Sequence, residues 1–292
     1  MAIIRFLMNG LTLGMTYALI AVGYSLVFGI LRLINFSHGA MYALGAHVAM
    51  VVVGFRLSPY LGLLASVMFC GCIGVCTDKV ALKPLRKKDA PPITSLITTV
   101  GLSYVIQNLL QIIFNTERKP FPNFYYFGQL NILGVSVSSA SVIVLCASGL
   151  LLFVLTMIIY RTKTGLAMRA IQQNMRAARL LGINVNKVIM LTFFMAGVSA
   201  AIAGTLMAAY YQTVYSTMGF TIGLKAFSAA ILGGIGNLYG SVLGGLIIGV
   251  TESFAAGYIG GTFRDSIAFI ILILILLIKP TGLFGRKGVN KI

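Results

Sequence analysis

The chain has 292 residues, of which 59% are hydrophobic and only 9% are charged, and its formal net charge is +17. This composition excludes an ordinary soluble domain, in which about 25% of residues are charged. The basic residues gather in short segments between long apolar runs, so the charge reports membrane topology and not a nucleic-acid-binding face. The sequence therefore predicts an all-α polytopic membrane protein that is surrounded by lipid and binds no nucleic acid.

Four apolar runs in the first half of the chain are each long enough to cross ~30 Å of hydrocarbon as a helix. They are expected as spans at residues 5–30, 36–55, 60–82 and 93–114. The break after the third span, KPLRKKDAPP at residues 83–92, is strongly basic and is therefore placed in the cytoplasm. The loop at 115–134 holds the aromatic run FPNFYYF, which favours the membrane–water interface and fits an outer loop.

Three further spans are expected at residues 137–160, 188–212 and 263–278. Between the last two, a Gly-rich stretch near 224–245 interrupts the apolar run. Two shorter pieces, at about 224–234 and 238–257, fit this run better than one helix, because broken helices at membrane depth occur where backbone is buried or lines a cavity. The sequence predicts a bundle of eight or nine transmembrane segments, depending on whether the first piece crosses the membrane or re-enters.

The glycines of the stretch GGIGNLYG, residues 233–240, suit helix packing better than nucleotide binding. Gly236, Gly240 and Gly244 recur every four residues, as do Gly245 and Gly249, which allows helices to approach closely. Neither a dinucleotide fingerprint nor a phosphate loop is present, since no strand precedes the stretch and nothing reads G-x-x-x-x-G-K-[ST]. We expect this chain to bind no cofactor and no metal, and Gly234, Gly236 and Asn237 to form a flexible break beside a solute path.

The distribution of basic residues gives the orientation. If the spans alternate across the membrane, 16 of the 22 lysines and arginines fall on one side, which the positive-inside rule makes the cytoplasm. With nine segments the N-terminus is outside and the C-terminus inside. With eight, both ends share a side.

The one long polar segment, residues 161–187, carries six basic residues and no carboxylate. Asn174 is placed to cap a short helix whose end Gly182 marks, and Asn186 to cap the next span. On a helix from about residue 168, one face is apolar and the other basic. The apolar face holds Ile171, Met175, Ala178 and Leu181, the basic face Arg169, Arg176 and Arg179, and Leu180 is an exception. The segment is either a solvated basic loop or a docking element for a partner.

Three charged residues lie within or beside apolar segments, where charge is costly and indicates function or a structural partner. Lys225 and Asp265 are expected near a membrane surface. Glu252 either caps a helix end or faces the bundle interior, where it would join the solute path.

A polar cluster, Asn35, Ser37 and His38, separates the first two spans at a position suited to the lining of a vestibule. His38 and His47 have no Cys, Asp or Glu at ligand spacing, so both are expected to be hydrogen-bonded residues and not metal ligands. No nucleophile, base and orienting acid can be assembled, so the sequence does not indicate an enzyme.

Three stretches resemble the permeases of high-affinity branched-chain amino acid ABC importers. Residues 9–39 end in LINFSHG, which is similar to the Leu-Ile-Asn-Phe-x-His-Gly of that family. The second stretch resembles the cytoplasmic coupling loop of importer permeases, which reads Glu-Ala-Ala, three residues and then Gly. The same spacing occurs here in Arg176-Ala177-Ala178 and Gly182, with Arg176 in place of Glu. The third stretch is GGIGNLYGSVLGG.

This resemblance covers nearly the whole chain and implies one transmembrane permease domain, residues 1–292, with a coupling loop at 161–187 in the bacterial inner membrane. It implies a second related permease chain, two ATPase subunits that bind ATP–Mg, and an extracytoplasmic substrate-binding protein. Coupling would fall to Asn174, Arg176, Ala177, Ala178 and Gly182. Similar permeases serve importers of urea or short amides. A stand-alone solute channel and a structural subunit without a pore are the two competing interpretations of the same sequence.

Overall fold

Helices account for most of the chain in the computed structural model, which describes residues 2–122, 128–132, 135–279 and 281–285. The helices of the first half are α1 (Ala2–Leu31), α2 (Ser37–Gly54), α3 (Pro59–Cys76), α4 (Lys83–Lys87), α5 (Pro92–Phe114) and α6 (Ser139–Arg161). Those of the second half are α7 (Lys163–Gln173), α8 (Met175–Leu180), α9 (Val185–Tyr211), α10 (Met218–Gly233), α11 (Leu238–Tyr258) and α12 (Arg264–Ile278).

Eight helical segments in the described part of the chain are long and apolar enough to cross a membrane, and α10 is a shorter apolar helix. This confirms the prediction of an all-α polytopic membrane protein. The third span is longer than expected, because a π-helical segment, Thr77–Leu82, joins α3 to α4 and carries the helix into the basic segment. The predicted cytoplasmic loop there is reduced to the few residues before Pro92, which begins α5.

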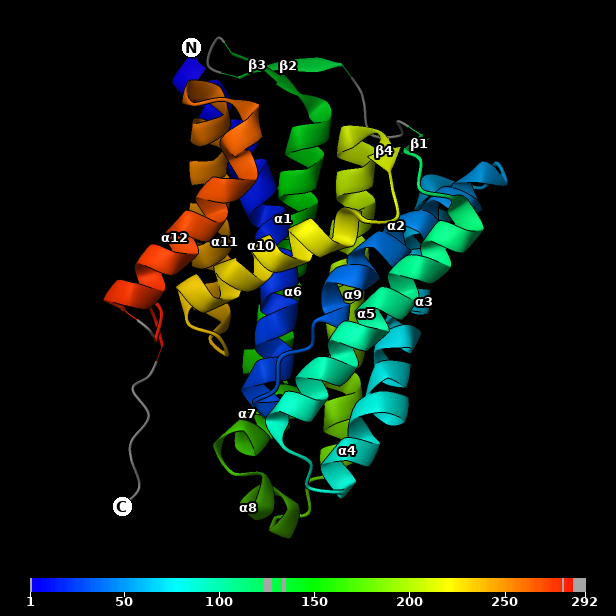
Figure 1. Ribbon diagram of the computed structural model, residues 1–292, viewed down its shortest axis with the longest axis vertical. Coiled ribbons are helices and arrows are strands. Elements are labelled where there is room, and N and C mark those ends of the chain that lie inside the picture. Colours follow the sequence, from blue (N-terminus) through cyan, green and yellow to red (C-terminus); the bar gives the residue numbers. More distant parts are fainter. Residues whose placement is uncertain (1, 123–127, 133–134, 280, 286–292) are drawn as a thin grey trace.

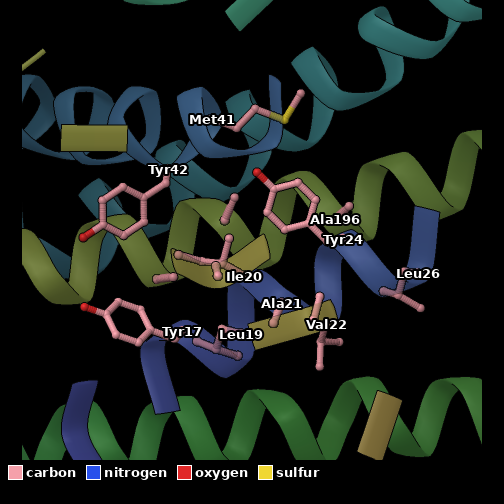
Figure 2. Close-up of a cluster of buried hydrophobic side chains, with 14 of the residues drawn as sticks. Tyr17, Leu19, Ile20, Ala21, Val22, Tyr24, Leu26, Met41, Tyr42 and Ala196 are labelled. Atoms are coloured by element: carbon pink, nitrogen blue, oxygen red, sulfur yellow. The ribbon is translucent and has the colours of Figure 1, made fainter. Parts of the chain in front are cut away.

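α1 lies at the centre of the bundle and is buried on every side. Between Thr12 and Val27 all side chains but that of Met15 are buried. Figure 2 shows residues of α1 beside Met41 and Tyr42 of α2 and Ala196 of α9. A helix that is apolar all round has no amphipathic face to orient it, so neighbouring helices fix its position.

Small residues let two helix pairs approach closely. A Cβ added at Gly245 or Gly249 of α11 would collide with the α1 backbone at Ala18 or Gly14. On the other side of α11, Gly240 and Gly244 lie against Gly233 and Ala229 of α10. The predicted close approach is thus confirmed at Gly240, Gly244, Gly245 and Gly249, with α11 held between α1 and α10. The prediction is wrong for Gly236, which lies in the turn before α11, where an added Cβ would meet no atom closer than 3.6 Å.

The two ends of the bundle differ in charge. Figure 1 shows the N-terminus and all four strands at one end and α4, α7 and α8 at the other. The strands are β1 (Lys119–Pro120), β2 (Gln129–Ile132), β3 (Val135–Ser138) and β4 (Thr213–Val214), with β1 paired to β4 and β2 to β3. The basic segments 83–88 and 161–187 lie at the α8 end, which the positive-inside rule assigns to the cytoplasm. Residues 123–127 of the expected aromatic loop, and the basic tail from 286, lie outside the described residues.

α10 and α11 form the predicted broken pair. α10 starts at Met218, six residues before the expected position, and runs obliquely across the middle of the bundle (Figure 1). Its 16 residues span about 24 Å at 1.5 Å per residue, which is less than the thickness of the hydrocarbon core. After the turn at 234–237, α11 returns to the N-terminal end and α12 runs away from it (Figure 1). The described residues thus hold eight span-length helices and the short α10. Whether α10 crosses the membrane or re-enters stays a prediction.

Candidate functional site

The polar segment folds into two short helices at the cytoplasmic end. Thr162 begins α7 by accepting a hydrogen bond on Oγ1 from the N–H of Gly165 (3.1 Å). Met168 and Ile171 of α7 are buried against the bundle. The chain becomes extended at Asn174, which separates α7 from α8. The segment is therefore an ordered cap on the bundle and not a solvated loop.

α8 is fixed at both ends by the residues that the sequence indicated. Asn174 Oδ1 accepts hydrogen bonds from the N–H groups of Arg176 and Ala177, both at 3.0 Å. Gly182 has φ +80°, and the N–H of Ile183 donates to the carbonyl of Ala178 (3.1 Å), which closes the helix end. The structure confirms Asn174 and Gly182 as the limits of this helix.

The expected cap of α9 at Asn186 is wrong. The helix starts at Val185, and Asn184 Oδ1 accepts from the N–H of Lys187 (3.1 Å). Asn186 therefore lies inside the first turn. The sequence offers two asparagines two residues apart, and only the backbone conformation decides which one precedes the helix.

The two leucines at the end of α8 are the most exposed apolar pair on this cap. Ala178 is buried, as predicted, but Leu180 is 89% and Leu181 80% exposed. The prediction that Leu181 lies on the apolar face is wrong because α8 ends at Leu180 and the helical periodicity stops there. Arg176 and Arg179 are also exposed, so two leucines and two arginines form one surface, the Leu180–Leu181 patch.

The polar cluster before α2 is buried and hydrogen-bonded. Asn35 Oδ1 accepts from the N–H (3.2 Å) and the hydroxyl (2.6 Å) of Ser37. His38 Nε2 lies 3.2 Å from the carbonyl of Ile20, and its ring packs edge-on against Tyr24. The expectation that His38 is a hydrogen-bonded residue is confirmed for Nε2. This cluster holds the start of α2 on α1.

A small cavity of about 30 Å³ lies beside this cluster, between α2, α5 and α10. Its lining is mostly apolar and includes Phe36, Tyr104, Phe220 and Leu224, with the hydroxyl-bearing Ser103. The lining includes Phe36 and Gly39, which are neighbours of the polar cluster in the sequence. It does not include the cluster residues themselves, Asn35, Ser37 and His38. The predicted path residues therefore flank this cavity, and their contact with a solute stays a prediction.

The turn between α10 and α11 contains three more of the predicted path residues. Gly234 (φ +97°) and Gly236 (φ +91°) adopt backbone conformations that glycine favours. Asn237 Oδ1 accepts from the N–H of Gly240 (3.2 Å) and so caps α11. The turn contacts α7, where Gln172 Nε2 donates to the carbonyl of Gly236.

Glu252 belongs to a third place, a buried ion cluster in which α10, α11 and α12 meet. Lys225 Nζ lies 2.8 Å from Glu252 Oε1 and 2.6 Å from Asp265 Oδ1. Arg264 pairs with the same Glu252 oxygen and donates to the hydroxyl of Tyr211 (3.0 Å). Glu252 thus faces the bundle interior, which was one of its two predicted positions. Two cations and two anions make the cluster neutral.

The expectation that Lys225 lies near a membrane surface is wrong, since its side chain is 4% exposed. The earlier start of α10 places Lys225 well inside this helix, opposite Glu252. Asp265 is 58% exposed and does lie at the outer end, as predicted. Sequence reasoning missed the pairing and missed Arg264 and Tyr211. The available signal was that positive and negative charges occur together in the last three apolar segments.

Comparison with known proteins gives one family over nearly the whole chain. Residues 6–277 match the family described as the permease component of the branched-chain amino acid transport system. The chain is 38% identical over 299 residues to the high-affinity branched-chain amino acid transport system permease protein BraD of Pseudomonas aeruginosa, covering 98% of this chain and 97% of BraD.

Two further relatives show how the similarity falls off. Identity is 33% over 297 residues to the permease protein LivH of Escherichia coli K12, which has the same described role, with 97% and 96% of the two chains covered. It is 27% over 239 residues to the ribose import permease protein RbsC of the same organism, with 80% and 72% covered.

Proposed function

The chain belongs to the family of branched-chain amino acid transport permeases, and on that premise we propose that it imports leucine, isoleucine and valine with energy from ATP hydrolysed on partner subunits. It is a multi-pass protein of the bacterial inner membrane. In this proposal the chain pairs with a second related permease, two ATPase subunits bind ATP–Mg at the cytoplasmic end, and a binding protein delivers the amino acid at the other end.

The Leu180–Leu181 patch is the observation that carries the proposal. It belongs to α8, which lies at the cytoplasmic tip of the bundle (Figure 1), and both leucines are exposed. α8 is short and fixed at both ends, so it presents the two leucines in one orientation, as a helix seated in a partner's groove requires. Because residues 161–187 contain no carboxylate, the groove that fits this patch is apolar with an acidic rim.

The face of α5 supports a second permease chain. α5 is one of the least buried of the long helices, and its outward face carries Gly101, Tyr104 and Asn108. An exposed amide such as that of Asn108 is costly against hydrocarbon, because lipid offers it no hydrogen-bond partner. We therefore assign this face to contact with the second permease and with the path between the two chains.

The cavity between α2, α5 and α10 supports a substrate with an apolar side chain. Phe36, Phe220 and Leu224 supply apolar walls, and Ser103 and Tyr104 bring hydroxyl groups to the lining. A branched-chain amino acid is a zwitterion with an aliphatic side chain, and it crosses most readily through a passage with few fixed charges. Alternating access to this cavity, driven by displacement of α8, completes the proposed cycle.

Co-purification of the ATPase subunits tests the docking step. We expect the double variant Leu180→Ala/Leu181→Ala to bind the ATPase subunits at least about 30-fold more weakly than the wild type, so that less ATPase co-purifies. Two central apolar contacts of an interface contribute about 2 kcal/mol or more to its affinity. The matched control is Leu277→Ala/Ile278→Ala, a pair on α12 with similar exposure (77% and 82%). Equal ATPase retention by both double variants would remove the docking proposal.

Uptake in intact cells tests the substrate. Cells that express the assembled importer should accumulate labelled leucine, and unlabelled isoleucine and valine should compete with it. Labelled urea serves as the alternative substrate. Accumulation of urea without leucine would overturn the assignment to branched-chain amino acids while leaving the importer proposal in place.

A further inference from the structure

The α10–α11 turn, residues 234–237, is a meeting point of separate parts of the chain. The N–H of Gly236 donates to Ser25 Oγ of α1 (3.2 Å). From the C-terminal segment, the N–H of Phe284 donates to the carbonyl of Gly233 (3.1 Å), and Asn237 Nδ2 donates to the carbonyl of Phe284 (3.3 Å). The turn therefore contacts α1, α11 and the C-terminal segment at once.

α7 of the docking cap reaches the same turn directly. Gln172 Nε2 donates to the carbonyl of Gly236 (3.4 Å). The side chain passes over Gly29 of α1, where an added Cβ would lie 3.4 Å from Gln172 Nε2. A Cβ at position 29 would therefore touch the amide that spans from α7 to the turn.

A second route from α7 ends on the first residues of α11. The guanidinium of Arg169 lies over the ring of Tyr160 at the end of α6, with Cζ 5.5 Å from the ring centroid. Tyr160 in turn stacks on Tyr239, with ring centroids 5.3 Å apart and planes 22° from parallel. α7 thus contacts the turn at Gly236 and, through one intervening ring, at Tyr239.

A small cavity adjoins these contacts. This cavity, of about 30 Å³, lies between α1, α6, α7 and the turn, and Ser25, Arg169, Gln172 and Gly236 belong to its lining. A close-packed interface would resist displacement, whereas a side chain that bridges an open space transmits it through few contacts. The other end of α10, at Phe220, lines the cavity between α2, α5 and α10.

We propose that Gln172 and Arg169 are positioning residues that couple the docking cap to α10. A displacement of α8 and α7 by the ATPase subunits would pass through Gly236 and Tyr239 to the turn, shift α10, and so change the cavity at its far end. This inference rests on the proposed function and adds to it the contacts that carry the motion. Proximity alone does not establish coupling, so the test measures transport per ATP hydrolysed.

The test variant is Gln172→Glu, which keeps the size of the side chain and removes the N–H donor. The matched control is Gln173→Glu, the same change one residue further along α7. Both are assembled with the full importer, and three quantities are measured: ATPase subunits retained, ATP hydrolysed, and leucine taken up. We expect the Gln172→Glu importer to retain the ATPase subunits normally. Its leucine uptake per ATP hydrolysed should fall at least about fivefold. Gln172→Lys, which restores a donor, should recover part of the loss.

The outcomes separate this inference from the docking proposal. If the wild-type chain retains no ATPase subunits, the docking proposal fails. If the ATPases are retained and Gln172→Glu carries as much leucine per ATP as Gln173→Glu, the coupling role of Gln172 is overturned. Should Gln172→Glu fail to reach the membrane, Tyr239→Leu tests the same link from the turn, with Tyr258→Leu as control. Equal leucine uptake per ATP in these two would likewise overturn the proposal.

Discussion

α10 is held in place at two regions, one by buried ion pairs and the other by neutral hydrogen bonds. Near its middle, Lys225 pairs with Glu252 and Asp265 at 2.8 and 2.6 Å, and Glu252 is fully buried. At its end, the turn is held by neutral hydrogen bonds of 3.1 to 3.4 Å to Phe284, Ser25 and Gln172, beside a cavity of about 30 Å³. Short charged contacts in a low-dielectric interior are difficult to separate, whereas long neutral hydrogen bonds beside a cavity are not.

This difference indicates which region of α10 stays fixed. The ion cluster holds α10 against α11 and α12 through two positive and two negative charges. We therefore take the cluster as the pivot about which α10 tilts. The turn next to the docking cap can be displaced at a smaller cost. A helix held at one point and pushed at another tilts, and tilting α10 changes the cavity that Phe220 and Leu224 line.

Removal of Glu252 should have the largest effect, because both cations of the cluster contact the same carboxylate oxygen. We expect Glu252→Ala to destabilise the folded protein by about 3–5 kcal/mol, the usual consequence of removing one partner of a buried ion pair, because the remaining acid, Asp265, is exposed and compensates little. Thermal unfolding of the purified protein in detergent measures the loss. Glu117→Ala, the same change at an exposed acid of the outer loop, is the control and should leave stability unchanged. Equal stability of the two variants would contradict the hypothesis that the ion cluster fixes α10.

The contrast also shows how far sequence reasoning extends. Span positions follow from the length of apolar runs, and the limits of α8 follow from Asn174 and Gly182, because caps are local properties. The break at Gly234 and Gly236 was predictable for the same reason. These elements depend on residues close together in the chain.

The parts that could not be predicted depend on residues far apart. Lys225 and Asp265 are separated by 40 positions, and their contact requires that α10 starts early and crosses the bundle obliquely. The contact of Gln172 with Gly236 depends on how α7 packs below α1. The exposure of Leu181 required knowing that α8 ends one residue before it. Tertiary packing fixes all three, and no local pattern reports it.

A change in the turn should affect transport more than folding. At Gly236, φ is +91° and an added Cβ would meet no atom closer than 3.6 Å, so Gly236→Leu costs mainly backbone strain of about 1–2 kcal/mol. We expect the variant to insert into the membrane at near-normal levels and to lose most leucine uptake. Gly260→Leu, on the outer side with φ +127° and open space around it, is the control. Loss of membrane insertion in parallel with uptake, or equal uptake in both variants, would show that the turn is only structural.

The smallest effect should come from the second acid of the cluster. Asp265 contacts Lys225 as closely as Glu252 does, but its side chain is 58% exposed and water screens the pair. Asp265→Asn leaves Lys225 paired with buried Glu252, so we expect a loss of at most about 1 kcal/mol in thermal unfolding and leucine uptake within twofold of the wild type. A loss as large as that of Glu252→Ala would mean that the outer acid, and not the buried one, holds α10. The pivot would then lie at the exposed start of α12, where a partner docking on the outer surface could release it.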